Sequence, residues 1–124
     1  MEGSLSGMDT NAKYILEYDF YGALLTKRQQ QVINLYHEEN LTLAEIAEEF
    51  GISRQGVHDT LKKAEALLDG YEEKLRLIAR FDDTRKGIAC ADSLIDELVR
   101  ENSSNKELTA KLNRIKKITD GLNN

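Results

Sequence analysis

The sequence contains no proline and only one cysteine among its 124 residues, and it has eight glycines. Because proline and glycine are the residues that disfavour helices most, their scarcity predicts a chain that is helical almost throughout. The single cysteine, Cys90, excludes an internal disulfide framework and fits a reducing cytoplasm. Its small neighbours Ala89 and Ala91 predict that Cys90 is a buried packing residue and not a reactive thiol.

Several motifs are also missing. No apolar run approaches the roughly 20 residues of a membrane span, and no signal peptide is visible. The chain has no glycine-rich phosphate loop, nucleophile motif or paired-cysteine pattern. His37 and His58 lack partners at metal-ligand spacing, so we interpret both as lone surface histidines. We therefore expect no enzyme, no cofactor, no metal and no membrane insertion.

The charge of the chain is unfavourable for a nucleic-acid binder. The net charge is −5, and by segment it is about −3 in residues 1–25, −2 in 26–68, −3 in 69–101 and +3 in 102–124. Because no global positive field surrounds the chain, any binding of DNA must rely on a local basic patch.

Helical signals begin near residue 8. Apolar residues at spacings of 4, 3 and 4 predict a first helix over about residues 8–23, with Ile15 and Leu24 widening the apolar stripe: Tyr14, Tyr18, Tyr21 and Leu25. We interpret these tyrosines as core residues with a solvated edge, in preference to a base-stacking platform. Two capping-box patterns follow, Thr26 with Gln29 and Thr42 with Glu45. They predict a second helix over residues 27–38 and a third that starts after Thr42.

Residues 41–68 carry the most informative pattern, LTLAEIAEEFGISRQGVHDTLKKAEALL. Its third helix places apolar side chains at i, i+3, i+4 and i+7, namely Leu43, Ile46, Ala47 and Phe50. Gly51 then supplies a left-handed helix terminator, Ile52 an apolar residue in the turn, and Ser53 the cap of the next helix. This order predicts a helix-turn-helix, with Ala47 at the helix crossing and Ile52 and Val57 filling its small core.

The fourth helix is predicted to be long. Its apolar residues repeat at alternating spacings of 4 and 3, which is a heptad seam: Val57, Leu61, Ala64, Leu68, Tyr71, Leu75 and Ile78. Gly70 weakens this helix without breaking it, so we expect one helix over residues 53–79. The seam is either a dimer surface or a face that closes within the chain against the last two helices.

Two amphipathic helices are predicted beyond this point. Asp82, Asp83 and Thr84 favour a new helix start, and a helix over residues 83–100 presents one apolar face: Ile88, Ala91, Leu94, Ile95 and Leu98. A polar loop precedes a last helix over residues 106–120, whose apolar face is Leu108, Leu112, Ile115 and Ile118.

Three parts follow from these signals. Residues 1–7 are expected to be a disordered leader, residues 8–79 a helix-turn-helix DNA-binding domain, and residues 80–124 a helical extension used for dimerisation or packing. We expect a homodimer.

A helix-turn-helix places the start of its second helix in the DNA major groove. With Val57 turned inward, steps of roughly 100° per residue place basic and polar side chains outward on the recognition helix. The candidate DNA-binding residues are Ser53, Arg54, Gln55, His58, Asp59, Lys62 and Lys63, with Lys27 and Arg28 at the start of the second helix and Thr42 at the start of the third. The free N–H groups at these two helix starts are further candidates for phosphate binding.

Side-chain chemistry assigns these candidates roles. Gln55 can pair with adenine N6 and N7, and Arg54 with guanine O6 and N7 or with a phosphate. Lys27, Arg28, Lys62 and Lys63 suit phosphates. Asp59 repels phosphate unless it accepts from cytosine N4. The alternative is a solvated helix face that is basic by coincidence, on a scaffold that binds a protein or ribonucleoprotein partner.

The segment from Leu24 to Leu75 resembles the YlxM family of small bacterial helix-turn-helix proteins, and the resemblance covers about residues 14–77. The pattern Leu16-Glu-Tyr-Asp-Phe-Tyr21 and the tail Gly70-Tyr-Glu-Glu-Lys-Leu75 favour this family. Residues 26–68 alone also resemble the promoter-reading C-terminal region of sigma factors. Gly56 and His58 depart from the motif, which more often has alanine and an aromatic residue there.

The resemblance implies an all-α fold: a three-helix head without a wing, a long fourth helix and a C-terminal helical extension. It also implies a DNA-binding regulatory protein of the bacterial cytoplasm, linked by gene neighbourhood to the signal recognition particle pathway. Double-stranded DNA and signal recognition particle components are thus the expected partners, and the adaptor hypothesis is the alternative.

Overall fold

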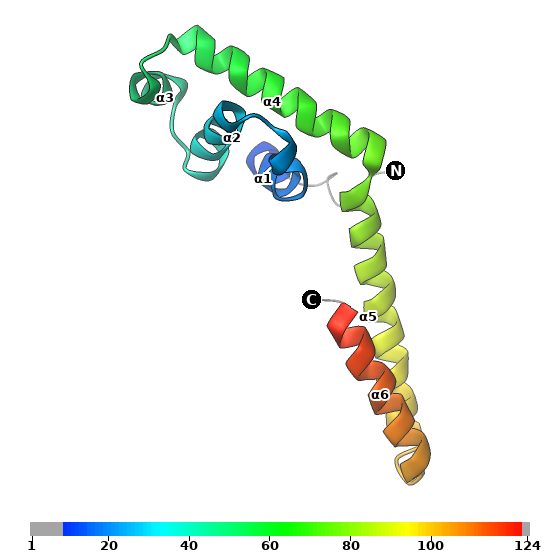
Figure 1. Ribbon diagram of the computed structural model, residues 1–124. Helices are drawn as coiled ribbons and strands as arrows, with labels where there is room; N and C mark the ends of the chain where they lie inside the picture. Colours follow the sequence, from blue (N-terminus) through cyan, green and yellow to red (C-terminus); the bar gives the residue numbers. More distant parts are fainter. Residues whose placement is uncertain (1–8, 123–124) are drawn as a thin grey trace. The chain divides into compact units, whose positions relative to one another are not determined.

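A computed structural model describes residues 9–122, and the expected leader, residues 1–7, lies outside them. The helices are α1 (Thr10–Tyr21), the 3₁₀ turn η2 (Gly22–Leu24), α2 (Lys27–Ile33), the π-helical η3 (Asn34–Glu38), α3 (Leu43–Phe50), α4 (Arg54–Leu75), α5 (Leu77–Glu101) and α6 (Lys106–Leu122). The part of the chain that the structure describes contains no strand, which confirms the all-α prediction (Figure 1). No helix in it is long and apolar enough to cross a membrane.

The helices of the structure form two compact units. The first, here called the head, is residues 9–79. The second, the C-terminal hairpin, is residues 80–122. Each is described by itself below.

The head begins its helices where the sequence places caps. Thr26 and Thr42 each accept from the backbone N–H three residues on, and the side chains of Gln29 and Glu45 accept in return, so both predicted capping boxes are confirmed. The first helix starts at Thr10, where Asp9 accepts from the N–H of Ala12 at 2.8 Å.

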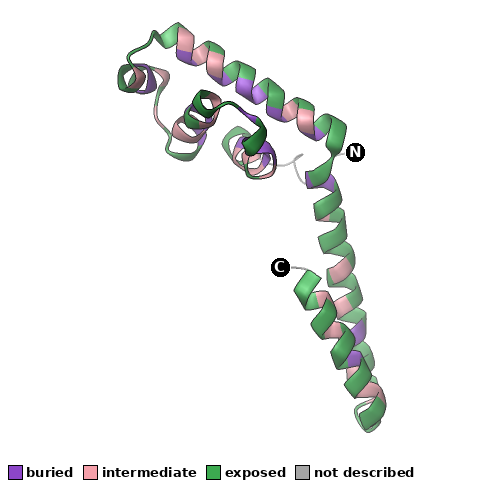
Figure 2. Cartoon of the chain, viewed as in Figure 1, coloured by how far each residue is buried: buried purple, intermediate pink, exposed green. Residues whose placement is uncertain are grey.

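The core of the head lies between α4 and the three helices that pack along it, α1, α2 and α3 (Figures 1 and 2). Its fully buried side chains include Val32 and Ile33 of α2 and Ile46 of α3. The first part of the predicted seam faces them and is buried: Val57, Leu61, Ala64 and Leu68. This part of the seam therefore closes within the head, against α1, α2 and α3.

The tyrosine stripe of α1 belongs to this core, as predicted. Tyr14 and Tyr21 are buried, and Tyr18 is partly buried. Gly22 is required at the end of α1 because a Cβ there would lie 2.7 Å from the ring of Tyr18.

The prediction of one unbroken helix over residues 53–79 is wrong. The helix α4 ends at Leu75, Arg76 takes a left-handed conformation with φ 54°, and α5 starts at Leu77. The predicted restart near Asp82 is also wrong, since α5 runs through it and Asp82 pairs with Lys86 one turn later at 3.0 Å.

A buried polar cluster explains the position of the break. The carboxylate of Glu72 accepts from the N–H groups of Ile78 at 3.1 Å and Ala79 at 3.2 Å, so it caps the start of α5. The hydroxyl of Tyr21 donates to Glu72 at 2.5 Å and accepts from the N–H of Leu77 at 3.1 Å. Burial and the bond to Glu72 raise the pKa of Tyr21 to about 12, so the hydroxyl keeps the proton that it donates.

The C-terminal hairpin is antiparallel. Lys116 of α6 pairs with Asp96 of α5 at 3.0 Å, and the hydroxyl of Thr119 donates to Asp92 further along. The hydrogen bond to Asp96 raises the pKa of Lys116. Among the described residues of the hairpin, Ile95 and Leu112 are the buried apolar side chains. Cys90 is exposed, and the prediction of a buried cysteine is wrong because its face of α5 does not pack on α6.

Candidate nucleic-acid interface

The turn between α3 and α4 closes as predicted. Gly51 has φ 67° and ψ 33°, a left-handed conformation that carries no Cβ penalty for glycine. The N–H of Gly51 donates to the carbonyl of Glu48, and that of Ile52 donates to Ala47 at 3.1 Å, which is a Schellman motif. Ser53 then caps α4, its hydroxyl accepting from the N–H of Gly56 at 2.9 Å.

The core of this helix-turn-helix differs from the prediction at one residue. Ala47 is buried at the helix crossing and Val57 is fully buried, as predicted. Ile52 is 38 % exposed, so its predicted role as a core plug is wrong. Its backbone is held in the Schellman motif, and its side chain lies beside Gly56 at the rim of the turn.

The candidate residues on the first turns of α4 face solvent. Arg54, Gln55, Asp59, Lys62 and Lys63 are exposed. His58 is partly buried, with Nδ1 3.6 Å from an oxygen of Asp59. The geometry therefore presents one polar face on the half of α4 that follows the turn.

Asp59 has a partner on this face that the sequence analysis missed. The side-chain amide of Gln55 donates to the carboxylate of Asp59 at 2.9 Å, one helical turn away. This bond uses one of the two N–H donors of Gln55 and leaves its other N–H and its carbonyl oxygen for a ligand. Asp59 consequently orients the side chain best suited to pair with a base.

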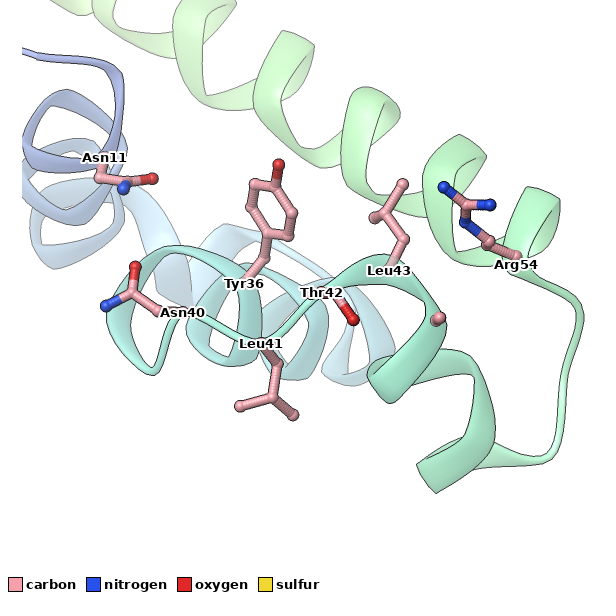
Figure 3. Close-up of a pocket in the computed structure, with 8 residues that line it drawn as sticks. Asn11, Tyr36, Asn40, Leu41, Thr42, Leu43 and Arg54 are labelled. Atoms are coloured by element: carbon pink, nitrogen blue, oxygen red, sulfur yellow. The ribbon is translucent and has the colours of Figure 1, made fainter.

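Arg54, His58 and Leu43 line one side of this face, in an open cavity of about 320 Å³ that also includes Gln55. A neighbouring cavity of about 420 Å³ brings Arg54 together with Thr42 and Leu43 at the start of α3 (Figure 3). The structure thus places two predicted groups, the recognition helix and the start of α3, beside each other.

The other side of the face joins α4 to the start of α2. Arg28, Asp59 and Lys63 line an open cavity of about 260 Å³ together with Thr26, Gln29 and Thr60. The guanidinium of Arg28 lies 4.2 Å from the ring centre of Phe50, a cation–π contact that orients it. Lys27 is exposed next to it.

The two helix starts differ in charge. At α3, the carboxylate of Glu45 accepts from the N–H of Thr42 at 2.8 Å, so a negative charge already lies at that helix start. At α2, the corresponding side chain is the neutral amide of Gln29, which accepts from Thr26 at 2.9 Å. Since phosphate is repelled by Glu45, the start of α3 is the less suitable of the two predicted phosphate positions.

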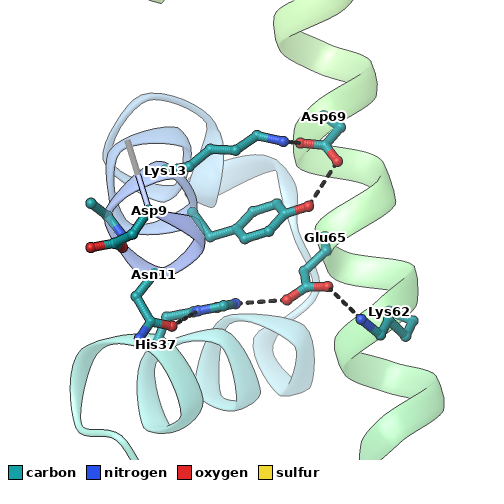
Figure 4. Close-up of polar contacts among 9 residues, drawn as sticks. Asp9, Asn11, Lys13, His37, Lys62, Glu65 and Asp69 are labelled. Atoms are coloured by element: carbon teal, nitrogen blue, oxygen red, sulfur yellow. Dashed lines mark hydrogen bonds and ion pairs between the residues drawn. The ribbon is translucent and has the colours of Figure 1, made fainter. Parts of the chain in front are cut away.

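His37 is not the surface histidine that the sequence predicts. It is 3 % exposed, and its Nε2 lies 2.7 Å from Glu65 while its Nδ1 lies 2.6 Å from Asn11 (Figure 4). The π-helical turn η3 carries it inward, between α1 and α4. The same carboxylate of Glu65 lies 3.5 Å from the ammonium group of Lys62. Lys62, one of the predicted phosphate ligands, is therefore paired with a buried carboxylate of α4.

Above this pair, Lys13 and Tyr14 of α1 both reach Asp69 of α4, at 3.0 and 2.9 Å (Figure 4). Burial, then the bond to Asp69, raises the pKa of Tyr14 above its usual range. Polar contacts on the inner side of α4 therefore hold the recognition helix against α1, a role for α1 that has no local signal in the sequence.

These features define a class: a helix-turn-helix protein whose recognition helix is extended and braced by additional helices. The sequence matches over residues 8–115 the family UPF0122, described as "Putative helix-turn-helix protein, YlxM / p13 like". The chain belongs to this family.

Named relatives agree with this assignment. A UPF0122 protein of Desulforamulus reducens is 51 % identical over 78 residues, which are 63 % of this chain and 67 % of the relative. UPF0122 proteins of Bacillus cereus and Bacillus anthracis are 42 % identical over 98 residues, which are 79 % of this chain and 89 % of each relative. The family prediction is therefore confirmed.

Proposed function

We propose that this protein is a DNA-binding regulator and not an enzyme, and that the first turns of α4 enter the major groove of a duplex. The observation that carries the proposal is the exposed face of Arg54, Gln55 and Asp59 directly after the Gly51 turn. In a helix-turn-helix, this is the part of the recognition helix that reaches base edges.

Gln55 reads adenine in this proposal. Its remaining N–H donates to adenine N7, and its carbonyl oxygen accepts from N6, while Asp59 holds the amide in place at 2.9 Å. Arg54 pairs with guanine O6 and N7 or with a phosphate on the side of the face where it lies with Leu43 and His58.

Phosphates are bound on the opposite side of the face. Arg28, fixed over Phe50, and Lys63 lie together there, and Lys27 is exposed beside them. Lys62 contributes less, because its ammonium group already lies close to the carboxylate of Glu65. Because the net charge is −5, this patch and not a global field attracts the duplex.

Selection of duplexes from a random pool by the purified chain tests this proposal. We expect enrichment of a motif that contains adenine, and we expect Gln55→Ala to lose the preference for that base. Asn113→Ala removes an exposed side-chain amide from α6, outside the proposed interface, so it serves as the matched control and should leave the motif unchanged. Failure to enrich any motif would contradict base reading by α4.

We further propose that the protein acts in the cytoplasm as a homodimer, as a transcription regulator linked to the signal recognition particle pathway. Dimeric helix-turn-helix proteins read half-sites about 34 Å apart, one turn of DNA. A duplex with two copies of the selected motif at that spacing should therefore bind more tightly than one with a half-turn added between them.

The second candidate is an adaptor that binds a protein or ribonucleoprotein, such as a component of the signal recognition particle. The basic side chains of α6 favour it, since they lie on an otherwise acidic chain: Lys106, Lys111, Arg114, Lys116 and Lys117. Substituting Arg54, Gln55 and Lys62 together by alanine separates the two functions. The adaptor is correct if the wild type binds no duplex and the triple variant still binds purified signal recognition particle.

A further inference from the structure

The C-terminal hairpin leaves large apolar side chains uncovered. Leu94 and Leu98 of α5 and Ile115, Ile118 and Leu122 of α6 are exposed, with Leu98 at 44 % and Ile118 at 65 %. Figure 2 shows how little of α5 and α6 is buried. A contiguous apolar patch of this kind on a small unit indicates an interaction surface.

These side chains lie on one side of the hairpin. Successive residues of a helix are rotated by roughly 100° about its axis. On this basis Leu94 and Leu98 lie to one side of the face of α5 that packs on α6, which Ile95 marks. On α6 the face that packs on α5 is marked by Leu112, and three residues are rotated away from it in the same sense and by a similar angle: Ile115, Ile118 and Leu122. The two helices run antiparallel and face each other. Residues that are rotated away from the packed face by the same angle and in the same sense therefore lie on the same side of the hairpin in both helices, and this applies to both groups of apolar residues. The ion pair between Lys116 and Asp96 flanks the opposite side.

That opposite side of the hairpin is polar. It carries Lys86 and Ser93 on α5 and Asn113 and Lys117 on α6, all exposed. The hairpin is therefore amphipathic as a unit, with one apolar layer that has no cover within residues 80–122.

We propose that a second copy of this chain covers the apolar side, so that two hairpins form a four-helix bundle with α5 of each chain stacked on α6 of the other. The two-fold axis then runs parallel to the helices. This inference extends the homodimer part of the proposed function by naming its surface, and it does not depend on DNA.

Charge selects this arrangement over the alternative. The outer edge of α5 is acidic, with Glu97 and Glu101; alongside α5, the outer edge of α6 carries Lys111 and Arg114, and its Glu107 lies beyond the end of α5. Stacking α5 on α6 of the partner brings opposite charges together. Stacking α5 on α5 of the partner brings the acidic edges together, which is unfavourable.

The register of the hairpin agrees with this pairing. Within one chain, Asp96 lies level with Lys116 and Asp92 level with Thr119. A two-fold axis parallel to the helices preserves these levels, so Glu101 lies level with Lys111 of the partner subunit and Glu97 with Arg114 of the partner subunit. By the same rule, Leu94 meets Ile118 of the partner subunit at the centre of the bundle.

The surface is large enough for a specific contact. The 17 residues of α6 span about 25 Å, and two helices packed side by side present a face about 20 Å wide. Each face then measures about 500 Å², and the pair buries about 1,000 Å², which is the lower bound of a specific interface. Because weak and transient complexes use interfaces of this size, we expect a dimer with a Kd in the micromolar range.

Sedimentation velocity on the full chain without DNA tests the proposal between about 1 and 100 µM, a range that spans the expected Kd. We expect the wild type to be a dimer at the upper end, and Leu98→Glu or Ile118→Glu to be monomeric at every concentration. Ser93→Glu on the polar side is the matched control and should dimerise like the wild type. Circular dichroism reports whether each variant keeps its helices. A wild type that sediments as one chain at the highest concentration, or a helical Leu98→Glu that still dimerises, would overturn the proposal.

Charge reversal tests the arrangement of the helices. Glu101→Lys places like charges at two symmetric positions and should weaken the dimer about tenfold, as should Lys111→Glu. The variant with both reversals should recover the wild-type Kd to within about threefold. If Glu101→Lys strengthens the dimer or leaves it unchanged, α5 does not stack on α6 of the partner. Because no duplex is present, these outcomes are independent of whether the head binds DNA.

Discussion

Glu17 should make the stability of the head depend on pH, and Glu17→Gln should remove that dependence. The side chain is 1 % exposed on α1, and its Oε1 has no hydrogen-bond partner among the described residues. Burial, followed by the neighbouring Asp69, raises the pKa of Glu17 from 4.5 to about 8, although Lys13 acts in the opposite direction and Glu72 adds to the increase.

The sign of the effect follows from this increase. The unfolded chain releases the proton of Glu17 near pH 4.5, whereas the folded chain holds it up to about pH 8. The stabilisation is therefore complete below pH 4.5, falls as the pH rises towards 8, and is lost above it. Each unit of difference between the folded and unfolded pKa corresponds to about 1.4 kcal/mol, so Glu17 changes the free energy of unfolding by at most about 5 kcal/mol between the acidic and alkaline ends. Because the charge of Glu17 interacts with the charges of Asp69 and Lys13, we expect a smaller change in the free energy of unfolding, of about 2–3 kcal/mol.

Urea unfolding at a fixed protein concentration between about pH 5 and pH 8.5 measures this contribution. Glutamine preserves the size of the side chain and has no charge to lose, so Glu17→Gln should be about 2–3 kcal/mol more stable than the wild type at the alkaline end and within about 1 kcal/mol of it at the acidic end. Glu48→Gln, at an exposed position of α3, is the control and should differ little at either pH. A stability difference between Glu17→Gln and wild type that does not change with pH would refute the reasoning.

Three further predictions concern the framework of the head. Gly51→Ala should lower the free energy of unfolding by about 1–2 kcal/mol, because the left-handed turn strains a Cβ, and unchanged urea unfolding would contradict this. Glu72→Ala should cost about 2–4 kcal/mol and accelerate amide hydrogen exchange at the start of α5, where two N–H groups lose their acceptor; unaltered exchange there would exclude the capping role. Leu68→Ala should cost about 2–5 kcal/mol in the same urea assay, whereas Leu67→Ala on the outer side of α4 should cost far less; equal losses would argue against the buried face assigned to α4.

The local signals of the head predicted its fold well. Two capping boxes, the Gly51 turn and the buried face of α4 follow from side chains that act within a few residues of one another. Such interactions are visible in a single sequence because their partners are neighbours in it.

Two of the wrong predictions, the unbroken fourth helix and the surface position of His37, involve partners that are distant in the sequence. The helix break at Arg76 depends on Tyr21, which lies 51 residues from Glu72. His37 is buried because Glu65, 28 residues away, meets it across the core. The heptad pattern continues through Leu75, so the sequence alone predicts an unbroken helix there. A histidine without a nearby partner in the sequence is likewise predicted to lie on the surface. Neither of the two tertiary contacts has a local signal.

The candidate interface could be predicted only in part. The spacing from Val57 identified the outward face of α4, and the cluster Thr26-Lys-Arg suggested the start of α2. The contact of Arg28 with Phe50 needed the fold, although an aromatic residue at the end of α3 was a signal worth following. The hydrogen bond from Gln55 to Asp59 was accessible from its i,i+4 spacing, and it gives the carboxylate a role other than repulsion.

Binding of a selected duplex at several salt concentrations tests the central claim, that the start of α4 reads DNA. Each head offers Lys27, Arg28, Arg54, Lys62 and Lys63, so we predict that the affinity of one head for a duplex with a single copy of the motif falls by about 10²–10³ between roughly 50 and 200 mM salt. Arg54→Ala should weaken binding to the selected duplex by about 10-fold or more, and Lys117→Ala on α6 should change it little. A flat salt response, or an Arg54→Ala variant that binds as tightly as the wild type, would contradict the account.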